Sequence, residues 1–444
     1  MHQLLRKVVA LKCRSALSTI SKPYYDIVIV GGGMVGNAMA ISLSLSNSLK
    51  AKKVLLIESG NIVPLVKTPI YSNRVSAVAL SSVEFLKELG IWDDLVRYRI
   101  KKVDRLQVLD SCSQSEIKLQ QSDYGKEVAY IIENNAIINS MFCYLQQAST
   151  VDLKMKMEIV EVCIPDSLKD LATLKLSDGT EIETSLVIGA DGLNSKVRQL
   201  LKVDCTEWEY GQKGVVATLE LQASSGNNVA WQRFMPTGPI ALLPLSDKHS
   251  SLVWSTSNQH ADMLLNTSKY QNPATNNLLT LVNKGISTIL HLESQPAPIP
   301  PVILSLQTDT RAAFPLGFRH CHTYITRRAA LIGDAAHRLH PLAGQGVNIG
   351  WNDVAILTKC LKKCANDGSD LGSLCYLSEY DRESRLYNLP MQLACDWINR
   401  LYRSSTTPVV MARSLGLYAI NMLTPLRVLT PFPVYHVLNV SDRV

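Results

Sequence analysis

Several patterns that would point to other classes of protein are missing from this chain of 444 residues. Its ten cysteines are scattered between Cys13 and Cys395, with no CxxC and no paired framework. Cys360 and Cys364 lie one helical turn apart, but no histidine or second cysteine pair completes a zinc pattern. We therefore predict buried or idle thiols in a reducing compartment. No run of eighteen or more uncharged apolar residues occurs, so no membrane-spanning helix is predicted.

Acidic residues are also missing from the start of the chain, where none precedes Asp26. The same stretch is basic and rich in hydroxyl groups, with Arg6, Lys7, Lys12, Arg14, Lys22, Ser15, Ser18, Thr19 and Ser21. This composition predicts a mitochondrial transit peptide over residues 1–24, with a merely basic tail as the alternative. A secretory signal is disfavoured because the apolar stretches are short and interrupted.

The rest of the composition is that of a folded protein. Hydrophobic residues make up 46% of the chain, which is enough to bury a sizeable interior. Charged residues make up only 19%, which argues against a disordered chain. The length predicts two closely joined domains.

A dinucleotide-binding fingerprint lies near the start of this folded part. Asp26–Val30 is a short β-branched run, and Gly31, Gly33 and Gly36 follow it at GxGxxG spacing. A helix over residues 37–49 and a strand over 53–57 complete a βαβ unit, and Glu58 falls at about the 20-residue spacing of the acid that binds ribose. Gly31 would permit the tight turn, Gly33 the approach of a pyrophosphate, and Gly36 close helix packing.

Two later segments repeat the pattern of a strand that ends in a glycine and an aspartate. Asp191-Gly192 follows the apolar run 185–188, and by composition alone it could be a simple capping turn. Gly333-Asp334 follows Ala329–Ile332 and leads into a Gly-rich turn and a helix beginning near Val347. A carboxylate at a strand end can hold a sugar-like hydroxyl, and a helix N-terminus can hold negative charge. FAD needs both, because it has a ribityl chain and a ring that is anionic when reduced.

Together these segments resemble the three motifs of the class A flavin monooxygenases, the family that contains para-hydroxybenzoate hydroxylase. The segment 333–350, with Ser72–Ser76, Trp231–Phe234 and Gly238–Ser246, resembles the ubiquinone (coenzyme Q) biosynthesis branch of that family. The resemblance covers residues 25–423, with the motifs in the expected order.

The resemblance implies a role for each matching residue. Gly31, Gly33 and Gly36 would hold the pyrophosphate, Glu58 the adenosine ribose, and Arg74 the phosphate region. Asp191 and Gly192 would support the fingerprint turn, and Asp334 after Gly333 would bind the ribityl hydroxyls. The flavin ring would lie along the segment that includes Pro341, Gly344, Gly346 and Asn348. The backbone N–H groups of Gly346, Val347 and Asn348 are the expected donors to the ring edge. No metal is expected. His337 and His340 are more simply read as structural than as catalytic bases.

The resemblance also implies a reaction. The family's enzymes hydroxylate aromatic rings through a flavin C4a-hydroperoxide. The ubiquinone branch acts on a polyprenylated 4-hydroxybenzoate-type phenol, here at C5, with O₂ as co-substrate. Its mitochondrial members take electrons from ferredoxin and ferredoxin reductase and work in a coenzyme Q synthesis complex at the matrix face of the inner membrane. A reductase or dehydrogenase of the same fold, and a non-catalytic FAD-stabilised scaffold of that complex, are the alternatives.

The predicted fold class is α/β, with a Rossmann-like FAD-binding domain, an inserted antiparallel β-sheet and a C-terminal helical region. The FAD domain would comprise residues 25–200 and 310–365, with a hairpin at 105–119 joining the substrate-binding sheet of residues 201–309. Residues 366–444 would be helical. They hold Arg400, Arg403, Arg413 and Arg427 and no acid between Asp396 and Asp442, which suggests contact with a membrane or a partner. A helix packed on the protein's own FAD domain is the alternative. A basic run (Arg97, Arg99, Lys101, Lys102, Arg105) could dock an acidic electron carrier, although a plain solvated surface is the simpler interpretation.

Overall fold

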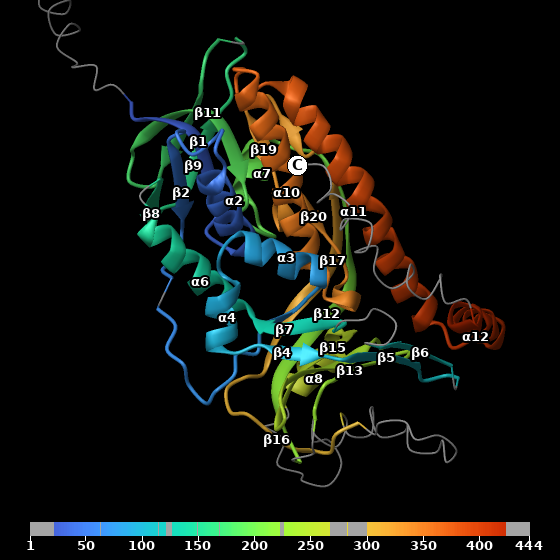
Figure 1. Cartoon of the computed structure of the whole chain (residues 1–444). Helices are drawn as coiled ribbons and strands as arrows, with labels where there is room; N and C mark the ends of the chain where they lie inside the picture. Colours follow the sequence, from blue (N-terminus) through green and yellow to red (C-terminus); the bar gives the residue numbers. More distant parts are fainter. Residues whose placement is uncertain are drawn as a thin grey trace, which may run out of the picture.

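A computed structural model describes residues 22–422, apart from 63, 114, 121–126, 149, 168, 223–225, 267–281 and 283–299. The predicted transit peptide up to residue 21 and Arg427 lie outside this part of the chain. The structure has the predicted mixed α/β architecture, with two large sheets, a small third sheet and two long C-terminal helices (Figure 1).

An eight-stranded sheet forms one body of the molecule, and the strands along its main path run in the order β18-β19-β11-β1-β2-β8. Its strands are β1 (Tyr24–Val30), β2 (Val54–Glu58), β8 (Val151–Met155), β9 (Ile159–Cys163), β10 (Ala172–Leu176), β11 (Glu181–Gly189), β18 (Ile325–Thr326) and β19 (Ala329–Leu331). β1 pairs in parallel with both β11 and β2, and its apolar run Ile27–Val30 is buried. Continuous apolar strands of this kind are typical of parallel sheets that are covered on both faces.

Helices cover this sheet and the connections around it. They are α2 (Met34–Leu45), α3 (Leu80–Glu88), α4 (Trp92–Tyr98), α6 (Asn134–Gln147), α7 (Lys196–Leu200) and α10 (Gly346–Asn366). α2 packs against both α10 and α6. It begins at Met34, inside the fingerprint, rather than at Asn37 as predicted, because the glycine turn already delivers the chain in helical conformation after Gly33.

The parallel strands bring the sequence motifs to one edge of this sheet. β1, β2, β11 and β19 end at Val30, Glu58, Gly189 and Leu331, each directly before or within a predicted motif. Because parallel strands have their carboxyl ends at the same edge, segments up to three hundred residues apart in the chain meet there.

A nine-stranded sheet forms the second body, with the strands along its main path in the order β20-β17-β12-β15-β14-β13-β5-β6. Its strands are β5 (Arg105–Asp110), β6 (Glu116–Gln120), β12 (Cys205–Leu221), β13 (Val229–Phe234), β14 (Ile240–Ser246), β15 (His249–Ser257), β16 (Ile303–Leu306), β17 (Ala312–Cys321) and β20 (His337–Arg338), with α8 (Asn258–Asn266) packed beside it. The β5–β6 hairpin joins the sheet through β13. The sheet also continues past the predicted boundary at 309, because β17 pairs with β12 along ten residues.

A three-stranded sheet lies between the two bodies and contains β3 (Val75–Val78), β7 (Ala129–Glu133) and β4 (Lys101–Val103). The chain ends its described part in α11 (Leu374–Arg403) and α12 (Thr407–Met422). α12 lies beside the β5–β6 hairpin (Figure 1). Within the described residues, no helix is both long enough and apolar enough to cross a bilayer.

Arg413 of α12 is one of the arginines expected at the surface, and the structure places it in the interior. Its side chain is 1% exposed and pairs with Asp110, which is 0% exposed, through two bonds of 2.8 and 3.0 Å. The guanidinium also donates to the carbonyls of Leu401 and Ser404. The residue therefore fixes α12 to the end of β5 and is not available to a lipid surface.

Replacing Asp110 with alanine should lower the free energy of unfolding by about 3–5 kcal/mol, because it leaves the Arg413 guanidinium buried without its counter-charge. The paired replacement Asp110→Leu with Arg413→Met should recover part of that loss, since neither charge of this pair is then buried. Urea unfolding of the wild type, Asp110→Leu, Arg413→Met and the double variant measures the coupling. Additive losses would contradict the prediction.

Candidate active site

The fingerprint turn between β1 and α2 admits glycine alone at two positions. Gly31 has a φ of +108°, and a Cβ there would lie 2.4 Å from the carbonyl oxygen of Ala190. A Cβ on Gly36 would lie 1.8 Å from the carbonyl oxygen of Gly31. Both contacts are with backbone atoms, which cannot move aside cheaply, so the turn requires hydrogen at both positions.

Gly33 differs from these two glycines because the space beside it is open. A Cβ there would meet no described atom within 4 Å. Gly33 is also the N-cap of α2, which has no side-chain cap and no acidic residue in its first turn. Its first backbone N–H groups, together with the dipole of the helix, can therefore hold an anion at the position that the sequence assigns to the pyrophosphate.

Glu58 lies beside this turn at the end of β2. Its carboxylate accepts hydrogen bonds from the backbone N–H groups of Gly32 and Gly60, both at 2.6 Å. These bonds hold the side chain next to the fingerprint, at the position expected for an acid that binds ribose.

The Asp191-Gly192 segment supports the fingerprint turn from the neighbouring strand. Ala190 donates its backbone N–H to Val30 and packs against Gly31. Asp191 accepts a bond of 3.1 Å from the backbone N–H of Val197, near the start of α7, and Gly192 has a φ of +74°. The segment is therefore also the capping turn that composition alone allowed.

The guanidinium of Arg198 connects this segment to the third motif. It is buried and donates to the carbonyl oxygens of Leu193 and Ala335, at 3.0 and 2.9 Å. Val35 of the fingerprint in turn packs against Gly333 and Gly350, where an added Cβ would lie 3.2 and 2.8 Å from it. The three motifs thus share contacts, although the chain separates them widely.

Gly333 and Asp334 form the turn after β19. Gly333 has a φ of +60°, and Asp334 lines a cavity, with no hydrogen bond to its carboxylate from the described residues. Surrounding protein atoms desolvate this carboxylate and raise its pKa, although the side chain opens into the cavity. A carboxylate without a protein partner at a cavity wall can accept hydrogen bonds from the hydroxyl groups of a ligand.

Asp353 of α10 anchors this turn from behind, a role that sequence reasoning missed. It is fully buried and accepts bonds from the Gly333 backbone N–H at 2.9 Å and from Asn388 at 2.9 Å. His337 Nε2 lies 2.6 Å from the same carboxylate and is also fully buried. His337 therefore bridges the loop to α10, as the structural interpretation predicted.

The first part of the Pro341–Asn348 segment, as far as Gln345, borders the cavity. Pro341 begins a short 3-10 helix (Pro341–Ala343), and Gly344 then adopts a φ of +59°. The side chain of Asn348 bonds the backbone of Ala77 and Ala79, which ties the start of α10 to β3. α10 begins at Gly346 without a side-chain cap or an acidic first turn, so its first N–H groups are available to a ligand.

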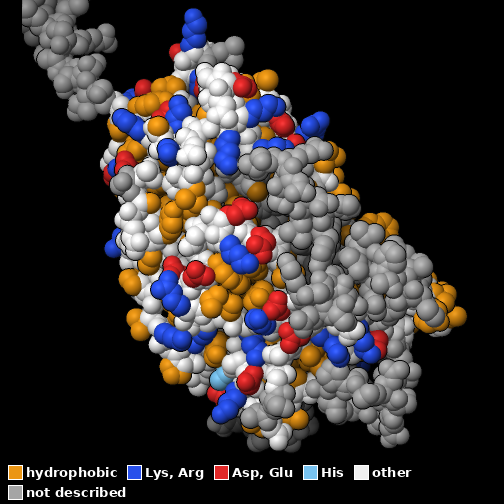
Figure 2. Space-filling view, viewed as in Figure 1, with side chains coloured by type: hydrophobic (Ala, Val, Ile, Leu, Met, Phe, Trp, Pro, Cys, Tyr) orange, Lys and Arg blue, Asp and Glu red, His pale blue; other side chains and the backbone are white. Residues whose placement is uncertain are grey.

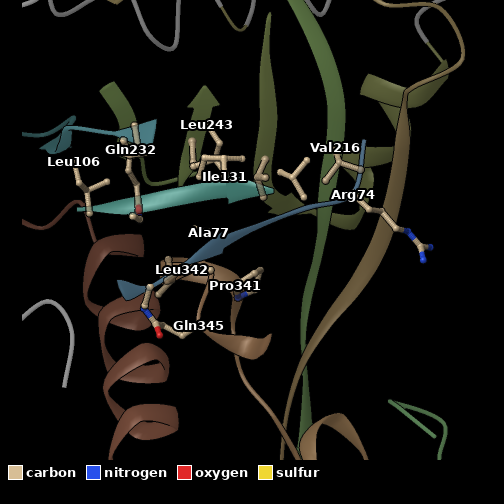
Figure 3. A pocket seen from close by; sticks show the side chains of 18 of the residues that line it. Arg74, Ala77, Leu106, Ile131, Val216, Gln232, Leu243, Pro341, Leu342 and Gln345 are labelled. Carbon is tan, nitrogen blue, oxygen red and sulfur yellow. The ribbon is translucent and has the colours of Figure 1, made fainter. Parts of the chain in front are cut away.

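The cavity itself has a volume of about 450 Å³ and is lined mainly by apolar side chains from the nine-stranded and the three-stranded sheets (Figure 3). Its lining includes Val75, Ala77, Leu106, Ile131, Val216, Gln232, Leu243, Phe314, Pro341, Leu342 and Gln345. Most of these residues were not predicted, because each is one residue of an ordinary half-buried strand. Arg74 also borders the cavity, but its guanidinium points away from the labelled apolar side chains (Figure 3).

His340 precedes this loop and is completely buried. Neither of its ring nitrogens has a hydrogen-bond partner among the described residues. Burial outweighs the nearby Asp396 and lowers the pKa of His340 to about 4. The ring is therefore neutral at physiological pH and packs edge-on against Tyr210.

This burial predicts a loss of stability in acid. The unfolded chain binds a proton at His340 near pH 6.5 and the folded chain only near 4, so the contribution of His340 is complete above pH 6.5 and falls as the pH drops toward 4. Between pH 7 and pH 5, the wild type should lose about 2 kcal/mol more than a His340→Leu variant. Urea unfolding at the two pH values tests this, and equal losses would argue that His340 is not buried as a neutral ring.

Four of the five basic residues in the run 97–105 have acidic partners. Arg97 pairs with Asp94, Lys101 with Asp247 and Lys102 with Glu127, while Arg99 bonds the buried Glu133. On the face shown in Figure 2, lysine and arginine are interspersed with aspartate and glutamate. Neutralised charges fit the plain solvated surface better than a docking site for an acidic carrier.

The arrangement fits FAD. The open glycine turn leads into the uncapped start of α2, and the carboxylate of Glu58 lies beside it. Much later in the chain, the carboxylate of Asp334, which has no hydrogen-bond partner among the described residues, opens into an apolar cavity. The family model described as an FAD-binding domain matches residues 24–386. The fold and the site thus define a class A, FAD-dependent monooxygenase.

The relatives narrow this class. The mitochondrial ubiquinone biosynthesis monooxygenase COQ6 of Caenorhabditis elegans is 45% identical over 91% of this chain and 94% of its own length. The proteins of the same name from Xenopus tropicalis and Homo sapiens are 42% and 39% identical, over 96% and 91% of this chain and of their own lengths. The chain belongs to this family of ubiquinone biosynthesis monooxygenases, and its location is the mitochondrion.

Solved structures agree on the fold. The p-nitrophenol 4-monooxygenase PnpA of Pseudomonas putida has a TM-score of 0.68 at 17% identity, covering 91% of this chain and 96% of its own. A 2-methyl-3-hydroxypyridine-5-carboxylic acid oxygenase has a TM-score of 0.64 at 17% identity, covering 89% and 96%. At these identities the likeness concerns the fold alone.

Proposed function

We propose that this enzyme hydroxylates the ring of a polyprenylated 4-hydroxybenzoate-type phenol at C5 during ubiquinone synthesis. The observation that carries the proposal is the apolar cavity of about 450 Å³ between the inserted sheet and the Pro341–Asn348 segment, with Asp334 in its wall. A cavity of this size and character suits an aromatic ring beside a flavin. The names of the relatives supply the pathway.

We infer the cofactor contacts from the same geometry. Gly31, Gly33 and Gly36 would hold the pyrophosphate at the start of α2, and Glu58 the adenosine ribose. Asp191 and Gly192 would keep the turn in shape, with Arg74 at the phosphate end.

The flavin half would lie at the other end of the site. Asp334, placed by Gly333, would bind the ribityl hydroxyls. Pro341 and Gly344 would flank the ring, whose N1–C2=O edge would face the backbone N–H groups of Gly346, Val347 and Asn348.

Reduced FAD supplies the activation of O₂ and the transfer of one oxygen atom to the ring. The residues of this chain contribute binding, orientation and the exclusion of water. The N–H groups at the start of α10 would stabilise negative charge on the reduced ring, a contribution of about 0.3–2 kcal/mol that acts at the atoms where the charge is located. The apolar lining would keep water from the reacting centre.

We further propose a peripheral position on the matrix side of the inner membrane. Each CH₂ of an isoprenoid tail gains about 0.8 kcal/mol from apolar surroundings, so the enzyme has to reach the substrate in the bilayer. α11 and α12 offer exposed apolar side chains for this contact, at Leu386, Leu393, Trp397, Leu401, Met411, Leu415 and Tyr418. On α11 they recur at spacings of seven, four and four residues, along one face of the helix.

The electron donor and the partners are also proposals. Ferredoxin with its reductase would deliver electrons, and the proteins of the coenzyme Q synthesis complex would be its neighbours. We also propose two domains, an FAD-binding domain over residues 25–200 and 310–365 and a substrate-binding sheet of residues 201–309, followed by the helical region 366–444. Within 310–365, β17 and β20 are the exception, because they extend the substrate-binding sheet.

An isotope experiment tests the reaction. Purified holoenzyme with ferredoxin, its reductase and a short-chain prenyl-4-hydroxybenzoate should place one atom of ¹⁸O from ¹⁸O₂ on ring carbon C5, as read by mass spectrometry. Product without label would favour a reductase or dehydrogenase. Full ubiquinone synthesis in cells that carry only an Asp334→Ala protein shown to lack flavin would favour a scaffold.

A further inference from the structure

Two cysteines that are far apart in the sequence face each other across the inserted sheet. Cys205 is the first residue of β12, Cys321 is the last residue of β17, and the two are direct partners in the antiparallel register. His322 donates its backbone N–H to Asp204, and Cys321 donates its own to Ala336. Cys205 and Cys321 are therefore a non-hydrogen-bonded pair, the type in which side chains approach most closely.

Their sulfur atoms lie 2.8 Å apart, and both cysteines are free thiols in the structure. Cys321 is fully buried, whereas Cys205 is partly exposed. The sequence predicted buried or idle thiols and did not indicate this contact. Spacing along the chain could not reveal it, because 116 residues separate the two positions.

The pair also occupies a particular place in the fold. β12 begins and β17 ends where the inserted sheet joins the FAD-binding part. The two thiols therefore lie at the junction between the inserted sheet and that part. The sulfur of Cys321 lies 3.9 Å from the carbonyl oxygen of Ala335, the residue after Asp334. A bond between the sulfurs would therefore join the first and last residues of the insertion, next to the third motif.

We propose that Cys205 and Cys321 form a redox modification site, which hydrogen peroxide converts into an intrachain disulfide. The Cys205 thiol loses its proton, and the thiolate attacks one peroxide oxygen. The O–O bond breaks to give a sulfenic acid and hydroxide, which takes up the released proton to become water. The Cys321 sulfur then attacks the sulfenic sulfur, and a second water leaves. Two thiols and one peroxide thus give one disulfide and two waters, with both sulfurs oxidised and the peroxide reduced.

The order of the two steps follows from exposure. Cys205 is the thiol that solvent reaches, and burial raises the pKa of Cys321, which suits it to the second, resolving step. The oxidant has a local source, because a flavin-dependent monooxygenase releases peroxide whenever reduced oxygen is not transferred to substrate.

A disulfide here would close a loop that contains the insertion from β12 to β17. Crosslinks that close long loops restrict the unfolded chain most, so the oxidised protein should be more resistant to heat. Cys360 and Cys364 provide a matched control. Both are buried on α10, but the thiol of Cys364 donates to the carbonyl of Asp370.

The test uses the purified holoenzyme and a titration with hydrogen peroxide. We expect a loss of mass equal to two hydrogen atoms, a Cys205–Cys321 peptide in a non-reducing digest, and a Tm higher by several degrees, all reversed by dithiothreitol. Cys205→Ser and Cys321→Ser should abolish all three changes. Cys360→Ala should keep them.

Two results would overturn the proposal. One is oxidation of the exposed thiols of Cys112, Cys163 and Cys375 while Cys205 and Cys321 stay reduced. The other is gain of oxygen atoms at Cys205 without a disulfide. Both are read from the wild-type protein, so the test does not depend on the folding of a variant.

Discussion

A Gly36→Ala variant should purify without bound FAD. The new methyl carbon would lie 1.8 Å from the carbonyl oxygen of Gly31 and 3.2 Å from the Cβ of Ala190. The first contact is with backbone, so α2 has to move away from β1 and the pyrophosphate site is lost. We expect the flavin absorbance per protein to fall at least tenfold and the free energy of unfolding of the apoprotein to fall by several kcal/mol.

Gly33→Ala is the matched control for this prediction. A Cβ at Gly33 meets no described atom within 4 Å, and the residue has a φ of −76°, which alanine adopts freely. The apoprotein should therefore keep its stability to within about 1 kcal/mol, the usual cost of alanine at an N-cap. FAD binding should still be lost, because the methyl group projects into the place proposed for the pyrophosphate.

The two variants therefore separate folding from binding. Flavin content by absorbance and apoprotein stability by urea unfolding are the measurements. If Gly33→Ala bound FAD as tightly as the wild type, the proposed position of the pyrophosphate would be wrong. If Gly36→Ala bound it normally, the geometry of the turn would be wrong.

Replacing Asp353 with alanine should destabilise the protein by about 3–5 kcal/mol, because it leaves hydrogen-bond donors without an acceptor in a fully buried site. Gly333, His337 and Asn388 would all lose their acceptor. Since Gly333 holds Asp334 at the cavity wall, the variant should also bind FAD at least tenfold more weakly. Asp353→Asn keeps the shape and one acceptor, so it should recover part of both losses.

Asp367→Ala is the control for Asp353. Asp367 lies at the other end of α10, is exposed, and bonds the hydroxyl of Tyr376 at 2.8 Å. It should cost less than about 1 kcal/mol and leave FAD affinity unchanged. Titration of apoprotein with FAD, followed by flavin fluorescence, measures the affinity. Wild-type affinity in Asp353→Ala would show that the buried carboxylate does not position the Gly333–Asp334 turn.

Local sequence was sufficient for the β1–α2–β2 unit. The turn at Gly31–Gly36 depends on residues within one short segment, and the lack of side chains there is itself the signal. The strand before Gly333 and the helix after Gln345 could also be predicted, because a buried strand and a helix start each have a local sequence pattern. The cofactor and the family followed from the order of these segments.

Long-range packing decided the rest. Arg413 reads as a surface charge in the sequence, and only the fold brings Asp110 to it across 303 residues. Asp353 is one polar residue in an amphipathic helix until the turn at Gly333 meets it. The cysteines at 205 and 321 become a pair only through the register of β12 and β17.

The sequence by itself determined the nucleotide-binding turn, the order of the three motifs and hence the class of enzyme. Each motif depends on glycine and aspartate residues within one short segment, so it can be recognised locally. Only the tertiary structure decided the walls of the apolar cavity, the partners of the buried charges and the contact between the two thiols. These depend on which strands lie side by side, and the pairing of distant strands has no signature within either strand.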